Sequence, residues 1–124
     1  MGQCIVKVAP DVDRYVVWSS VVDAPVSYSC TREQVLQWAV EDWHERPEQA
    51  EAHVVRADTY GSSDRAIGFG RWDDEDLQVV HGSPDDGWYH LPRARLADYM
   101  DALDRDDGPA AQALLVCFER FDDD

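Results

Sequence analysis

Positive charge is scarce in this sequence. Lys7 is the only lysine, and with the arginines it brings the basic residues to 11, against 26 acidic residues. A surface with so few cations offers no basic patch to the phosphates of nucleic acid or to an anionic membrane. We therefore exclude direct binding to nucleic acid and to membranes from the expected functions.

Long hydrophobic runs and paired cysteines are also missing. No segment approaches the roughly 18 apolar residues of a membrane span, and no basic segment followed by an apolar one marks a secretory signal. Cys4, Cys30 and Cys117 form no CxxC pair, so we expect reduced, partly buried thiols. These absences predict a cytoplasmic protein.

Motifs for catalysis, metal binding and phosphate binding are absent as well. His44, His53, His81 and His90 form no HxxxH or HExxH spacing, and the chain has no GxSxG turn and no glycine-rich phosphate loop. We interpret His81 and His90, which flank an expected hairpin turn, as a structural or exposed pair in preference to a metal or proton-transfer pair. The sequence predicts no enzyme, no metal and no cofactor.

Acidic residues are what the chain has in excess. The formal net charge is -15 over 124 residues, and residues 62–124 contribute -10 of it. Such a charge favours a basic protein surface as the partner. Asp accounts for 19 of the 26 acids, and the chain has 13 Ala. Because a high-GC coding bias produces the same skew, a compositional origin of the charge stays open as an alternative.

The hydrophobic pattern predicts one α+β domain over residues 1–121, followed by an acidic tail, 122–124. We expect a small antiparallel sheet of two hairpins, packed with three to four helices. Runs at 4–9 and 15–22 predict the first hairpin. The second of these runs is apolar at both parities, so we expect it to be central and covered on both faces. Runs at 77–81 and 88–91 predict the second hairpin.

Capping and periodicity predict the helices. A capping box at residues 31–34 begins one helix, which we expect to end near Arg46. Pro47 begins the next, with an inner stripe of Ala50, Val54 and Ala57. Pro92 begins a third, whose apolar positions are Leu96, Tyr99, Met100 and Leu103. Residues 110–121 fit either a helix or a buried strand, and their Ala-rich start favours a helix.

Three acidic stretches are predicted to form one partner-binding surface. In the two that span 72–76 and 85–89, acids are interleaved with aromatic residues, which supplies both long-range attraction and anchors that can be desolvated. The third is the outer face of the Pro92 helix, where Arg93 and Arg95 begin the helix and acids end it, against the preference of the helix dipole. The alternative places the tryptophans in the core and leaves the acids as solvated turn and capping residues. The predicted partner-binding residues are Trp72, Asp73, Asp74, Glu75, Asp76, Asp85, Asp86, Trp88, Tyr89, Asp98, Asp101 and Asp104.

These features predict a non-enzymatic, acidic binding domain of the inhibitor, immunity or anti-defence type. Its expected partner is a basic protein that acts on nucleic acid, such as a nuclease. In size and charge the chain is similar to toxin immunity proteins and to phage anti-defence proteins that imitate DNA, a similarity that covers no specific motif. The alternative is a generic structural or adaptor protein whose acidity reflects genome composition.

Overall fold

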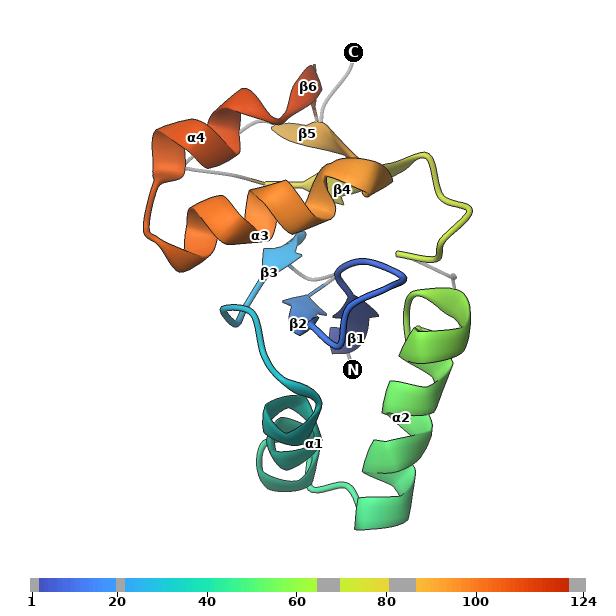
Figure 1. Ribbon diagram of the computed structural model, residues 1–124. Coiled ribbons are helices and arrows are strands. Elements are labelled where there is room, and N and C mark those ends of the chain that lie inside the picture. The colour runs from blue at the N-terminus through green and yellow to red at the C-terminus, as the bar shows by residue number, and fades with distance from the viewer. Residues whose placement is uncertain (1–2, 20–21, 65–69, 81–86, 121–124) are drawn as a thin grey trace.

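The protein consists of two small antiparallel sheets and four α-helices in the computed structural model, which describes residues 3–19, 22–64, 70–80 and 87–120 (Figure 1). The sheets have the strand orders β1-β2-β3 and β4-β5-β6, and the predicted α+β class is confirmed. Along the chain the elements are β1 (Gln3–Lys7), β2 (Tyr15–Ser19), β3 (Ala24–Pro25), α1 (Arg32–Glu41), α2 (Pro47–Tyr60), β4 (Asp76–Val79), β5 (Gly87–Pro92), a 3-10 turn η1 (Arg93–Arg95), α3 (Leu96–Asp104), α4 (Gly108–Ala113) and β6 (Val116–Arg120).

The first sheet lies between two hydrophobic cores. Val16 and Trp18 of β2 pack with α3, α4 and the second sheet. Tyr15 and Val17 point to the other face and pack with α1 and α2, as the two-residue period of a strand requires. All four side chains have 0% exposure. The prediction that this strand is central and covered on both faces is confirmed.

The predicted capping box begins α1. The Thr31 hydroxyl accepts from the Gln34 amide at 3.1 Å, and the Gln34 side chain accepts from the Thr31 amide at 2.9 Å. The helix ends at Glu41 and not near Arg46, so the expected end was wrong. His44 has a left-handed φ of +57°, which is incompatible with a continuing right-handed helix.

The second helix follows its prediction closely. Pro47 occupies the first turn of α2, where its missing amide hydrogen costs no hydrogen bond. The predicted inner stripe is fully buried, and its members Val54 and Ala57 pack with side chains of β1 and β2. Gly61 ends the helix with a φ of +94°, a conformation that a residue without a Cβ adopts at little cost.

The second sheet confirms the second hairpin and corrects the last helix. In β4 and β5, Leu77 is opposite Leu91, and both are buried in the core shared with the first sheet. Residues 110–121 were predicted to be helical, but α4 ends at Ala113, and β6 pairs with β5. The aromatic and β-branched residues of β6 suit a strand, and the edge of β5 supplies hydrogen bonds that no local pattern contains. The expected tail, 122–124, lies outside the described residues.

All three cysteines are free. Cys4 is buried, which raises the pKa of its thiol to about 11, and Cys30 is half-buried. Cys117 is exposed on β6, so the expectation of a partly buried thiol was wrong there. Cys117 is exposed because it lies on the outer strand of its sheet and not in the predicted helix.

Candidate protein-binding surface

The segment that leads from α2 to β4 folds into a tight acidic turn. The Trp72 amide donates to the last residue of α2 at 2.9 Å, and a carboxylate oxygen of Asp74 accepts from the Gly70 amide at 2.8 Å. The Arg93 amide donates to the Glu75 carbonyl at 2.9 Å. Residues 70–75, which we call the Trp72 turn, are thus fixed at both ends. A fixed turn loses little conformational entropy when a partner binds.

Arg93 is 7% exposed, and its guanidinium lies against the Trp72 turn. Its carbon lies 4.6 Å from the centre of the Trp72 ring. It donates to backbone carbonyls at 2.6, 3.0, 3.2 and 3.3 Å, which belong to Lys7, Gly70, Val8 and Gly61 respectively. Burial lowers the pKa of Arg93 to about 10, so the group stays cationic at neutral pH.

These contacts correct the interpretation of Arg93 as a surface cation in the first turn of a helix. The residue lies in η1, before α3 begins, and its charge is taken up by carbonyl dipoles of three other segments. The unfavourable position relative to the helix dipole was the only sequence signal of this role. Arg95 is exposed and donates to the Leu114 carbonyl at 3.1 Å.

A hollow of ≈380 Å³ opens beside the Trp72 turn. The turn between β1 and β2 and the first residues of α3 contribute apolar side chains to it, and Asp74 and Glu75 contribute carboxylates. Asp73 and Glu75 are exposed, and neither has a side-chain hydrogen bond or ion pair among the residues that the structure describes. The turn therefore combines unpaired carboxylates with an apolar hollow.

The predicted residues of the second sheet form a separate group. His90 lies between two carboxylates, with Nδ1 3.3 Å from Asp76 and Nε2 3.7 Å from Glu119. The ring of Trp88 contacts that of His90, with 4.6 Å between the centroids. Asp76 and Trp88 are thus joined through His90 and not through the Trp72 turn. His81, the predicted partner of His90, lies outside the described residues.

Tyr89 points away from this group, because consecutive residues of a strand face opposite sides of the sheet. Its ring contacts that of Phe118 on β6, with 4.9 Å between the centroids. Asp85 and Asp86 lie outside the described residues. Of the second predicted stretch, 85–89, the structure therefore places only the residues of β5.

The three acids of α3 are exposed, but two of them are paired with an arginine. Asp98 is exposed, whereas Arg14 forms ion pairs of 2.8 Å with both Asp101 and Asp104. Asp104 also accepts from the Ser29 amide at 2.9 Å. Burial acts to raise the pKa of Asp104, but the bonds from Ser29 and Arg14 outweigh it and lower the pKa. The row of carboxylates along α3 is thus interrupted by an arginine of the same chain.

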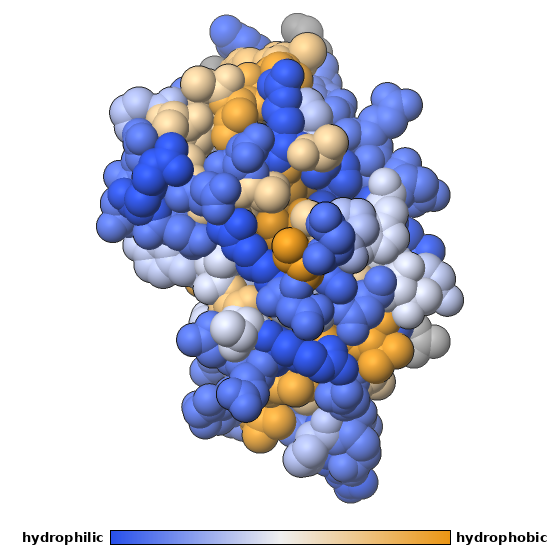
Figure 2. Space-filling view, in the orientation of Figure 1, coloured by the Kyte–Doolittle hydropathy of each residue, from blue (hydrophilic) through white to orange (hydrophobic). Residues whose placement is uncertain are grey.

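Hydrophilic side chains cover most of the face shown in Figure 2, and hydrophobic ones gather near α4 and in smaller patches over the half with α1 and α2. In the described part of the chain, no three His, Cys, Asp or Glu side chains are grouped as a metal site. None of the described helices has the length and apolar character that crossing a membrane requires. No family model, curated protein sequence or solved structure matches the chain.

A second polar cluster joins the first sheet to α2. A carboxylate oxygen of Asp58 accepts from the Tyr15 hydroxyl at 2.5 Å and lies 3.1 Å from the ammonium of Lys7, which is 8% exposed. Arg32 contacts the second oxygen at 3.2 Å. Burial acts to raise the pKa of Asp58, but the hydrogen bonds from Tyr15 and Lys7 and the charges of Lys7 and Arg32 outweigh it. The pKa of Asp58 is consequently lowered.

The lowered pKa of Asp58 predicts a loss of stability in acid. A carboxyl whose pKa is lower in the folded state stabilises fully above its unfolded value, about 4, and this contribution is lost as the pH falls through the folded pKa. Urea unfolding below pH 4 should therefore depend less steeply on pH in Asp58→Asn than in the wild type. Asp73→Asn, at an exposed carboxyl, serves as the control and should keep the wild-type slope. Equal slopes for Asp58→Asn and the wild type would contradict the prediction.

Proposed function

We propose that this chain is a non-enzymatic domain that binds a basic protein through the Trp72 turn. The observation that carries the proposal is the pairing of exposed, uncompensated carboxylates at Asp73 and Glu75 with the apolar hollow beside Trp72. A lysine or arginine has the matching structure, since its aliphatic stem covers apolar surface while its charged end stays near carboxylates.

The proposed partner is a protein that acts on nucleic acid, such as a nuclease, and the proposed effect is its inhibition. A net charge of -15 attracts the basic groove that such a protein uses for phosphates. An immunity or anti-defence role fits a small domain that works by occupying that groove. In this proposal the Trp72 turn supplies the contact, because Asp101 and Asp104 on α3 are already paired with Arg14.

One observation favours the alternative of a structural or adaptor protein with compositional acidity. Asp58, Asp101 and Asp104 each contact a basic residue of the chain itself, and Asp107 caps α4 by accepting from the Ala110 amide at 3.1 Å. These acids stabilise the fold and need no partner to account for them. The two proposals differ in what the remaining exposed acids do.

Neutralising Asp73 and Glu75 tests the proposal. We expect the double variant Asp73→Asn/Glu75→Gln to slow association with a basic partner about tenfold and to flatten its dependence on salt, because exposed charges act over roughly 8 Å at physiological ionic strength. The partner is first recovered from cell lysate by its salt-sensitive retention on the immobilised protein and then purified. Association rates are measured by surface plasmon resonance at several salt concentrations.

The matched control removes the same charge elsewhere. Glu33 and Glu48 are exposed in the first turns of α1 and α2, and the first turn of α2 is at the other end of that helix from Trp72. Glu33→Gln/Glu48→Gln should change the association rate less than about twofold if placement matters beyond net charge. Equal effects of the two variants would favour compositional acidity, and unchanged binding by both would contradict the proposed function.

A further inference from the structure

Residues 26–29, between β3 and α1, form a ridge with a hollow on each side. One hollow, of ≈440 Å³, lies between this Tyr28 ridge and the end of α3. The other, of ≈480 Å³, lies between the ridge and α1. Figure 2 shows the left outline of the molecule indented between the half with α3 and α4 and the half with α1 and α2. The two hollows share no lining residue with the hollow beside Trp72.

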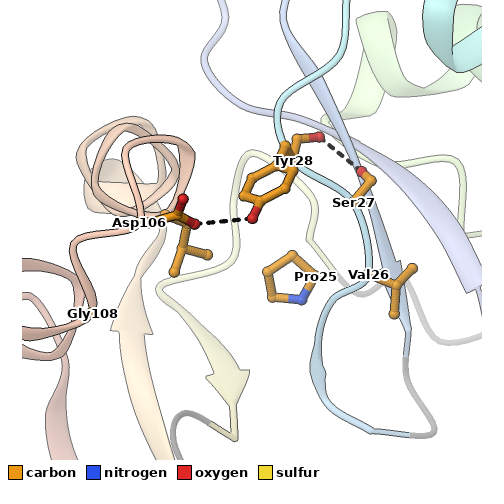
Figure 3. Close-up of a pocket in the computed structure, with 7 residues that line it drawn as sticks. Pro25, Val26, Ser27, Tyr28, Asp106 and Gly108 are labelled. Carbon is orange, nitrogen blue, oxygen red and sulfur yellow. Dashed lines mark hydrogen bonds between the residues drawn. The ribbon is translucent and has the colours of Figure 1, made fainter.

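The ridge exposes large side chains where most of the surface is charged. Tyr28 is 60% exposed and Val26 is 38% exposed. Pro25 and Leu103 add apolar surface to the first hollow, and Trp38 adds it to the second. Figure 3 shows the Tyr28 ring reaching across the first hollow toward the end of α3. Exposed aromatic and aliphatic groups beside open hollows are typical of protein contact sites.

Hydrogen bonds fix the ridge along its whole length. The Ser27 hydroxyl accepts from the Val17 amide at 3.0 Å and donates to the Tyr28 carbonyl at 2.9 Å. The Tyr28 hydroxyl donates to Asp106 at 3.0 Å (Figure 3). The Ser29 amide is held by Asp104 on α3. Because the ridge is already ordered, its side chains are presented to a partner without an ordering cost.

The charged side chains that line the two hollows are acidic. Arg14, which donates to the Ser29 hydroxyl of the ridge at 2.9 Å, is itself paired with Asp101 and Asp104. Asp106 lines the first hollow, and Glu41 and Asp42 line the second; the described lining includes no Lys, Arg or His. None of these three carboxylates forms an ion pair within the described residues. The bond from the Tyr28 hydroxyl leaves the charge of Asp106 in place, since the donor is neutral.

We propose that the Tyr28 ridge is a second docking surface, occupied by a basic segment of a partner protein with an apolar side chain between Lys or Arg residues. The apolar side chain would pack on Tyr28 and Val26, and the cations would face Asp106 on one side and Glu41 and Asp42 on the other. A second copy of this chain is disfavoured because it also carries a net charge of -15. This inference rests on the proposed function only in taking the partner to be basic.

A synthetic basic peptide of Arg, Leu and Ala tests the ridge directly. In an NMR titration of labelled protein, we expect the largest shifts at Val26, Tyr28 and the Trp38 indole. Tyr28→Ala should weaken the affinity about tenfold, as for an aromatic contact residue, whereas Tyr28→Phe keeps the ring and should stay within about threefold. Tyr60→Ala is the matched control, at a tyrosine that is 49% exposed, and should leave the affinity unchanged. A peptide with Ser in place of Leu should bind about tenfold more weakly, because it lacks the apolar contact.

Unchanged affinity in Tyr28→Ala, or no peptide binding to the wild type, would overturn the inference. The Asp73→Asn/Glu75→Gln variant separates this failure from that of the proposed function, and it should bind the peptide as the wild type does. If that variant loses the peptide while Tyr28→Ala retains it, the peptide binds at the Trp72 turn. The ridge inference then fails, while the proposed function keeps its support.

Discussion

Replacement of Arg93 by Met is expected to lower the free energy of unfolding by about 4 kcal/mol. Hydrogen bonds from a charged donor contribute about 1.5–3 kcal/mol each, and the guanidinium makes four of them to carbonyls. Removing the charge relieves a desolvation cost of about 3 kcal/mol, which the lowered pKa reflects. The lost bonds outweigh that relief, because buried carbonyls are left without their donor. Urea unfolding measures the change as a lower midpoint with an unchanged slope.

Two further variants test whether the loss of stability comes from the planar guanidinium of Arg93, from its charge alone, or from removing any arginine in this segment. Arg93→Lys keeps the charge, but an ammonium cannot reproduce the planar fork of donors, so we expect a loss of about 2 kcal/mol. Arg95→Met makes the same change two residues later, at an exposed side chain, and should cost less than about 1 kcal/mol. Equal losses for Arg93→Met and Arg95→Met would contradict the structural role assigned to Arg93.

Elements with a local signal were predicted well from the sequence. The capping box at Thr31 and Gln34 and the proline that begins α2 depend on residues within one helical turn, so their effect is independent of the rest of the chain. Apolar residues occupy both the odd and the even positions of β2, which predicted burial on both faces. Because successive side chains of a strand point to opposite faces, both faces have to be covered to bury all of these residues.

Features that depend on distant residues were missed. The sequence of β6 suits a strand as well as a helix, and only the open edge of β5 decides between them. Arg93 reaches carbonyls as far away as Lys7, and Arg14 reaches Asp104 across 90 residues. Such pairings arise from the packing of β1, β2 and α3, which no spacing in the sequence encodes.

Only part of the candidate site could be predicted, because contacts between residues far apart in the sequence decide which acids are paired. Composition and local interleaving indicated the Trp72 turn, where Asp73 and Glu75 are exposed. Composition alone could not distinguish these acids from Asp101 and Asp104, which form ion pairs with Arg14. The function of the exposed acids stays a prediction, and the salt dependence of binding decides it.

Replacement of Gly61 by Ala is expected to cost about 3 kcal/mol, since a left-handed conformation alone costs an L-residue about 1–2 kcal/mol. Gly61 has a φ of +94°, and a Cβ there would lie 2.8 Å from the Trp72 amide nitrogen and 3.0 Å from the Gly70 carbonyl oxygen. Both contacts are with backbone, so the Trp72 turn has to move. Moving Gly61 itself would lengthen the bond of 2.9 Å that its carbonyl accepts from the Lys7 amide.

Gly108→Ala is the matched control for this substitution. Apart from its two chain neighbours, a Cβ on Gly108 meets nothing within 4 Å. Gly108 begins α4 and precedes Pro109, which makes the helical conformation less favourable for a residue with a Cβ, so that variant should cost less than about 1 kcal/mol. In urea unfolding, a large loss in Gly61→Ala beside a small loss in Gly108→Ala would tie stability to the packing of the Trp72 turn on the end of α2. Similar midpoints for both variants would mean that the turn shifts at no cost, and the fixed geometry proposed for binding would then lose its basis.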